Sequence, residues 1–160
     1  MSYPLFTLIT LYLVDKEILK KPILYLSDFF ERNKNLYYDN LTRVRTHNDI
    51  KQWLKFFLVG VIETAQSGVK TFDDILKLKQ QAELDIQTLG SRAKNAHKVL
   101  QYLFKHPLIE VNKIHEILDV SKRTAYNLIN DLETLNILKE ITGSKRDKLY
   151  VFDRYLKLFE

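Results

Sequence analysis

The fold is decided by residues 112–135, which have the sequence NKIHEILDVSKRTAYNLINDLETL. Residues 112–118 carry apolar side chains at helical spacing, and this spacing predicts a short helix with one buried face. The side chains of that face are Ile114, Ile117 and Leu118. Asp119 and Val120 are predicted to form a tight turn, since Asp tolerates the left-handed conformation at modest cost. Ser121 then favours the start of a second helix, because its hydroxyl can accept a hydrogen bond from an unpaired backbone N–H.

This second helix has an apolar face and a polar face. The apolar residues recur at helical spacing and are predicted to point inward: Ala125, Leu128, Ile129, Leu132 and Leu135. Asn136 follows, and Asn tolerates the left-handed conformation at which helices end. The side chains left outside the core are those of Lys122, Arg123, Thr124, Tyr126, Asn127 and Asn130. Side chains of these types contact phosphates and the edges of DNA bases.

Two short strands are predicted after this helix, at residues 137–142 and 148–152. The hairpin tip between them carries Lys145, Arg146 and Lys148. A further helix precedes the segment, so the order is helix, helix, tight turn, helix, hairpin. We therefore predict a winged helix-turn-helix with a two-stranded β-hairpin wing.

Helix and hairpin tip together are predicted to form one basic surface, as expected of a protein that binds duplex DNA. In this interpretation the second helix enters the major groove, and the cations of the tip reach the backbone or the minor groove. Winged helices also serve as protein-interaction modules, and cations on a helix are often only a solvated face. A structural or protein-binding role therefore stays open beside DNA binding.

Composition favours a mostly α protein whose positive charge lies in its C-terminal part. The chain has 160 residues, four Gly, three Pro and a formal net charge of +5. Residues 1–90 hold 12 basic and 11 acidic side chains, a net of +1, whereas residues 91–160 hold 13 and 9, a net of +4. The absence of Cys excludes disulfides and suits a cytoplasmic protein.

The first 14 residues carry no charged side chain. This run is shorter than the roughly 20 apolar residues that span a bilayer. It also lacks the basic start and the cleavage site of a signal peptide. We therefore predict a buried helix over residues 4–19 and no membrane partner. The expected organisation is a helical region at residues 1–69, a linker helix at residues 70–90, and the winged helix-turn-helix at residues 91–160.

The sequence PILYLSDFFERNKNLYYDNL at residues 22–41, followed by WLKFFL at residues 53–58, resembles the C-terminal part of Fic-domain proteins. The resemblance implies an all-helical layer from an enzyme family that transfers AMP from ATP to protein hydroxyls. In one common bacterial branch a long linker helix and a winged helix follow the Fic domain, as expected here. The aromatic group of this segment is expected to belong to the core: Tyr25, Phe29, Phe30, Tyr37 and Tyr38.

The catalytic signature of that family, H-P-F-x-[DE]-G-N-G-R, does not occur in the sequence. His106 and Pro107 match only its first two letters, with no glycine following, and are predicted to be structural. The glycines are too far apart for a phosphate-binding loop, and the histidines lack the spacing of metal ligands. We therefore expect no catalytic residue, no metal and no cofactor, with ATP relevant only if the intact Fic site were restored. The expected loop position would precede residue 5, so the missing part is interpreted as truncation, a split gene or a choice of fragment.

The favoured prediction is a DNA-binding, transcription-regulatory module attached to a catalytically incomplete Fic-like remnant. Its expected partners are double-stranded DNA and a second copy of the chain in a homodimer. One alternative is a protein-interaction and dimerisation module. The other is a C-terminal subunit of an AMP transferase whose catalytic loop comes from an upstream Fic chain.

Overall fold

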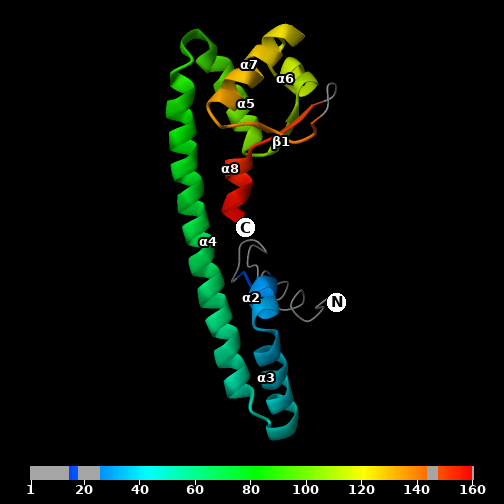
Figure 1. The fold of residues 1–160 in the computed structure, drawn as a ribbon. Helices are drawn as coiled ribbons and strands as arrows, with labels where there is room; N and C mark the ends of the chain where they lie inside the picture. Colours follow the sequence, from blue (N-terminus) through cyan, green and yellow to red (C-terminus); the bar gives the residue numbers. More distant parts are fainter. Residues whose placement is uncertain (1–14, 18–25, 144–147, 160) are drawn as a thin grey trace. The chain divides into compact units, whose positions relative to one another are not determined.

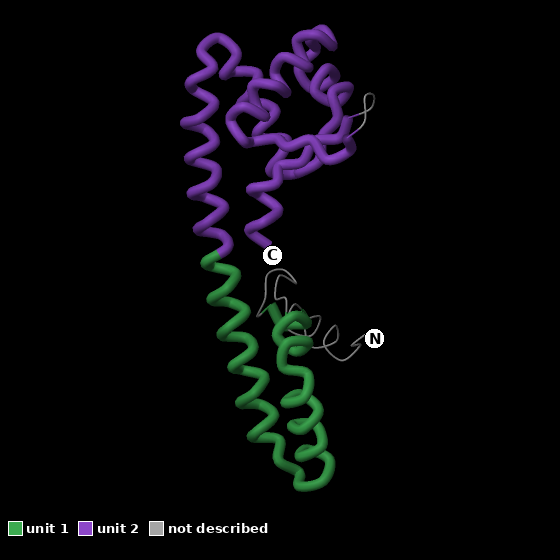
Figure 2. The backbone as a smooth tube through the Cα atoms, viewed as in Figure 1, with its two compact units in different colours: residues 1–70 green, residues 71–160 purple. Residues whose placement is uncertain are grey.

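The computed structural model describes residues 15–17, 26–143 and 148–159. These residues are mostly helical, with one small antiparallel sheet near the C-terminus. The chain divides into two compact units, residues 1–70 and residues 71–160, and the division falls within one long helix (Figures 1 and 2). The predicted helix at residues 4–19 lies almost wholly outside the described residues.

The N-terminal unit contains α2 (Leu26–Arg32), α3 (Lys34–His47) and the first part of α4 (Ile50–Gln87). Its buried side chains are Leu26, Phe29, Phe30, Tyr37 and Phe56, together with the amide of Asn40. The expectation that the aromatic group is core is therefore confirmed for Phe29, Phe30 and Tyr37. Tyr38 is exposed, and Tyr25 lies outside the described residues.

The start of α4 follows directly from the sequence. Asn48 adopts the left-handed conformation (φ 54°) and ends α3. Asp49 then caps α4, because its Oδ1 accepts a hydrogen bond of 3.2 Å from the Gln52 N–H. From there α4 continues without interruption through Gly68 to Gln87.

The C-terminal unit begins with the last turns of α4, whose Leu78, Ala82 and Ile86 are buried in its core. Four helical elements and three strands of this unit matter for the candidate site: η1 (Gly90–Arg92), α5 (Ala93–Leu103), β1 (Leu108–Glu110), α6 (Val111–Leu118), α7 (Lys122–Thr134), β2 (Lys139–Glu140) and β3 (Leu149–Val151). The chain ends with α8 (Asp153–Leu156) and η2 (Lys157–Phe159). In Figure 1, α5, α6 and α7 gather beside the sheet.

The sheet corrects the predicted two-stranded hairpin, because it has three strands in the order β1-β3-β2. Both pairings are antiparallel, with Ile109 opposite Tyr150 and Lys139 opposite Val151. β1 lies between the first two predicted helices, where the sequence predicts no strand, since three residues are too few to show the alternation of a strand. The other two strands exist but are shorter than predicted, because only Lys139–Glu140 and Leu149–Val151 pair regularly.

Candidate nucleic-acid interface

The turn between α6 and α7 has the geometry that the sequence predicted. Asp119 is left-handed at φ 51°, and this conformation ends α6. Ser121 has an extended backbone, and its hydroxyl accepts a hydrogen bond of 3.2 Å from the Thr124 N–H. The same hydroxyl lies 2.9 Å from the Thr124 hydroxyl. The predicted N-cap is therefore confirmed, and both side chains contribute to starting α7.

The inner face of α7 fixes its orientation in the C-terminal unit. Four of its residues are 3% exposed or less: Ala125, Leu128, Ile129 and Leu132. These side chains belong to the same core as Ile114 of α6 and Tyr150 of β3. Because a helix with one fully buried face must present the opposite face outward, the core determines which α7 side chains are available to a partner.

All six predicted site residues on α7 are exposed: Lys122, Arg123, Thr124, Tyr126, Asn127 and Asn130. Among them Arg123, Asn127 and Asn130 are separated by four and three residues, so they lie in one row along the helix. Tyr126, 45% exposed, lies beside this row. The row faces away from the buried face and ends, one helical turn further, at the exposed Thr134.

The carboxylates of α7 lie off this row. Asp131 accepts a hydrogen bond from the Arg92 guanidinium at the end of η1, and the two form an ion pair. Glu133 is half-buried, and its charge adds to the rise in the pKa of Tyr150 on β3, which is caused chiefly by burial of the phenol. The exposed row therefore offers a guanidinium and two amides without an acidic side chain among them.

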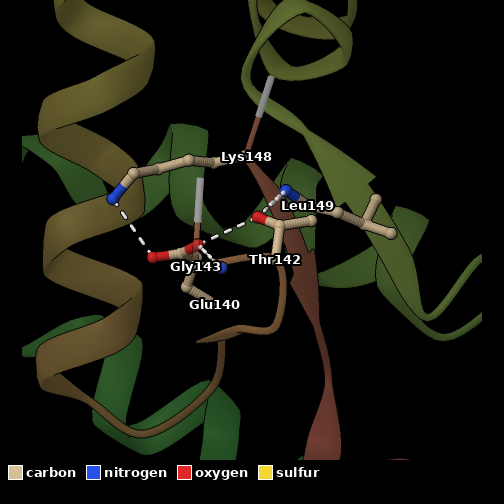
Figure 3. Close-up of polar contacts among 5 residues, drawn as sticks. All are labelled: Glu140, Thr142, Gly143, Lys148 and Leu149. Atoms are coloured by element: carbon tan, nitrogen blue, oxygen red, sulfur yellow. Dashed lines mark hydrogen bonds and ion pairs between the residues drawn. The ribbon is translucent and has the colours of Figure 1, made fainter. Parts of the chain in front are cut away.

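The hairpin end of the site is organised by Glu140 (Figure 3). One carboxylate oxygen accepts hydrogen bonds from the Thr142 hydroxyl at 2.9 Å and from the Gly143 N–H at 2.8 Å. The other oxygen is 3.1 Å from the Lys148 ammonium. The Thr142 hydroxyl in turn accepts a hydrogen bond of 3.3 Å from the Leu149 N–H. This network joins the two sides of the β2–β3 connection across residues 143 and 148.

Glu140 and Lys148 shift each other's pKa. Hydrogen bonds from Thr142 and Lys148 hold the pKa of Glu140 below its usual value of 4.5. Conversely, the hydrogen bond to Glu140 raises the pKa of Lys148, and Glu133 on α7 contributes more weakly in the same direction. Lys148 is thus a cation already engaged by a carboxylate, in contrast to the exposed Lys122 and Arg123.

Of the three hairpin cations predicted for the site, only Lys148 can be placed, since Lys145 and Arg146 lie outside the described residues. Sequence reasoning missed Glu140 as the partner of Lys148. The two residues are eight positions apart, and only the strand register, with Glu140 opposite Tyr150, brings them together. A Glu on one strand and a Lys beside the facing strand predict an ion pair only once the register of the two strands is known.

No protein-family model matches the sequence. Within the described ranges, no cluster of three or more His, Asp or Glu side chains is arranged to hold a metal ion. Among the same residues, no helix combines the length and the apolar character that crossing a membrane requires.

Proposed function

We propose that the C-terminal unit is a winged helix-turn-helix that binds double-stranded DNA through α7. The main support is the exposed row of Arg123, Asn127 and Asn130, because the opposite face of the same helix is fixed in the core. The helix order, the capped α6–α7 turn and the antiparallel sheet support this interpretation. In this proposal the β2–β3 connection is the wing.

The residue types in the row suit base recognition in the major groove. An Arg guanidinium can form two hydrogen bonds with guanine, and an Asn amide can form two with adenine. The major groove, at about 12 Å, is wide enough to admit one α-helix. Lys122, at the first position of α7, would then meet the phosphate backbone, where helix N-termini and cations commonly bind.

The electrostatic contribution follows from the number of phosphates that the cations of this unit neutralise. Lys122, Lys145 and Arg146 are the proposed phosphate contacts, because Arg123 is assigned to a base edge and Lys148 is paired with Glu140. Each phosphate neutralised contributes about −0.9 to the slope of log affinity against log salt concentration, so three contacts give a slope of about −2.7.

The test begins with selection of duplexes from a random-sequence pool by the full chain. The affinity for a selected duplex is then measured by fluorescence anisotropy at several salt concentrations. Arg123→Ala should lower that affinity by about 1–3 kcal/mol and relax the preference at one base pair. Lys105→Ala is the matched control, because it removes one exposed cation that follows α5 rather than one on α7. Equal losses in both variants, or no selected sequence at all, would reject α7 as the reading element.

The same exposed row also suits docking on a protein, and Tyr126 is the specific observation in its favour. Tyr and Arg are enriched among the residues that dominate protein interfaces. This second candidate predicts no duplex binding even at low salt. It also predicts that Tyr126→Ala abolishes capture of a protein partner.

For the N-terminal unit we propose a non-catalytic remnant of the Fic type. The support is the sequence at residues 22–41 and 53–58 together with the absence of the His–Gly–Asn–Gly–Arg signature from the printed sequence. The chain incubated alone with labelled ATP and protein acceptors should transfer no AMP. Transfer that appears on adding a separate chain bearing the signature would instead support the transferase-subunit alternative.

A further inference from the structure

We propose that an apolar stripe along α4 is the interface of a parallel homodimer of this chain. The stripe consists of Leu58, Ile62, Ala65, Val69, Phe72 and Leu76. All six side chains are exposed, and Val69 and Phe72 are 64% and 60% exposed. A helix surface with this many exposed apolar side chains in one line is expected to bury them against a partner.

The stripe is separate from the faces of α4 that the chain uses for its own cores. Gly60 approaches the buried Phe29 ring, and Leu78 lies in the C-terminal core. At about 100° per residue, Val69 lies about 180° around the helix from Gly60, and Leu76 lies about 160° from Leu78. The six side chains therefore belong to a face that the described cores leave exposed, although Val61, one turn before Ala65, packs against the N-terminal core at the edge of this face.

The spacing of the stripe fits a second helix. Its steps are four, three, four, three and four residues, which average to the repeat of a coiled coil. In heptad notation Ile62, Val69 and Leu76 occupy the a positions, whereas Leu58, Ala65 and Phe72 occupy the d positions. β-branched residues at a, combined with Leu at d, favour two parallel strands over larger assemblies. Ile62 and Val69 at a and Leu58 at d fit this combination, whereas Ala65 and Phe72 at d do not contribute to it.

Charge does not oppose an identical copy as the occupant. The flanking e and g positions from 59 to 75 are Val59, Val61, Gln66, Gly68, Asp73 and Ile75. Asp73 is thus the one charged side chain among these flanking positions of the described helix. In a parallel pair a g residue faces the e residue five positions later in the other copy, so Asp73 faces Gly68. Two copies therefore meet without placing like charges opposite each other.

The stripe has a defined end. The next d and a positions are Lys79 and Glu83, which pair with each other within α4 at 4.0 Å. The apolar part covers residues 58–76, about 28 Å of helix at about 1.5 Å per residue. An interface of this length is small, so we expect a dimer that dissociates on dilution rather than an obligate one.

The first test is sedimentation equilibrium of the full chain without DNA over a range of concentrations. The wild-type chain should approach dimer as the concentration rises, and Val69→Glu should weaken association by about tenfold or more. Ser67→Glu is the control, because it adds the same charge to an exposed position about 160° from Val69 on the same helix. Circular dichroism of both variants checks that the helix content is unchanged. A chain that stays monomeric throughout, or equal weakening by both variants, would overturn the proposal.

The second test determines whether the two α4 helices of the dimer run parallel. Because the chain has no native Cys, an introduced Cys is the only thiol that can cross-link. In a parallel dimer the two copies of residue 69 face each other across the seam, so Val69→Cys should cross-link on mild oxidation. Ser67→Cys, on another face, should not. A Val69→Cys chain that dimerises but fails to cross-link would refute the parallel arrangement. Because neither test contains DNA, their outcome is independent of whether α7 binds a duplex.

Discussion

Two glycines on α4 allow a matched test of how its first half packs. A Cβ at position 60 would lie 2.5 Å from Cδ1 and 2.6 Å from Cε1 of Phe29, whereas a Cβ at position 68 would meet no atom within 4 Å. Both residues lie inside the same uninterrupted helix. We therefore predict that Gly60→Ala and Gly68→Ala change stability in opposite directions.

The magnitudes follow from two effects. Replacing Gly by Ala inside a helix stabilises by about 0.5–1 kcal/mol, and Gly68→Ala should gain this amount. At position 60 the same gain is opposed by overpacking, which costs about 1–3 kcal/mol. The Phe29 ring cannot move away cheaply, because its centroid is 5.5 Å from that of Phe30 and 5.3 Å from that of Phe56. The helix-propensity gain cancels between the two variants, so their free energies of unfolding should differ by about 1–3 kcal/mol.

The assay is urea unfolding followed by the fluorescence of Trp53, the single Trp of the chain. This residue lies in the first turns of α4 and stacks on Phe57, with ring centroids 5.5 Å apart, so its signal reports on the N-terminal unit. Both variants are compared at one protein concentration. If Gly60→Ala unfolds at the same urea concentration as Gly68→Ala, α4 does not approach Phe29 as described.

Three further predictions concern the C-terminal unit. Ser121→Ala should destabilise α7 by about 0.5–2 kcal/mol through loss of its N-cap, seen as faster amide hydrogen exchange in that helix; unchanged exchange would contradict the cap. Because the folded pKa of Glu140 is depressed, its contribution to stability is present above its ordinary value of 4.5 and is lost as the pH falls through the lower, folded value. An NMR titration of the Gly143 amide should therefore show a midpoint below 4.5, and a midpoint at or above 4.5 would show that the network is absent. If the chain binds duplex DNA as proposed, Glu140→Gln should release Lys148, raise the affinity and steepen the salt slope by about 0.9, whereas an unchanged slope would mean that Lys148 meets no phosphate.

The features predicted correctly from the sequence are those encoded within one or two helical turns. The Ser121 cap depends on a bond to a residue three positions away, and the left-handed Asp119 and Asn136 depend on their own backbone preferences. The buried face of α7 follows from spacing alone. The exposure of Arg123 and its row is then a geometric consequence, because a helix cannot bury both faces against one core.

The features that were missed depend on residues far apart in the chain. Strand β1 exists because Ile109 pairs with Tyr150, 41 positions later, and its three residues carry no pattern of their own. The pairing of Lys148 with Glu140 likewise requires the register of β2 and β3. A count of basic residues in the hairpin therefore overestimated the charge available at that end of the site.

The burial of Leu78, Ala82 and Ile86 against the C-terminal helices determines where a shorter recombinant fragment can begin. A recombinant fragment that starts at Gly90 would expose to solvent the apolar surface that those three side chains cover, and it would be prone to aggregate. Arg154, whose guanidinium lies 3.7 Å from the Asp85 carboxylate, would lose its counter-charge in the same cut. A fragment meant to fold as the C-terminal unit therefore has to begin at about residue 71.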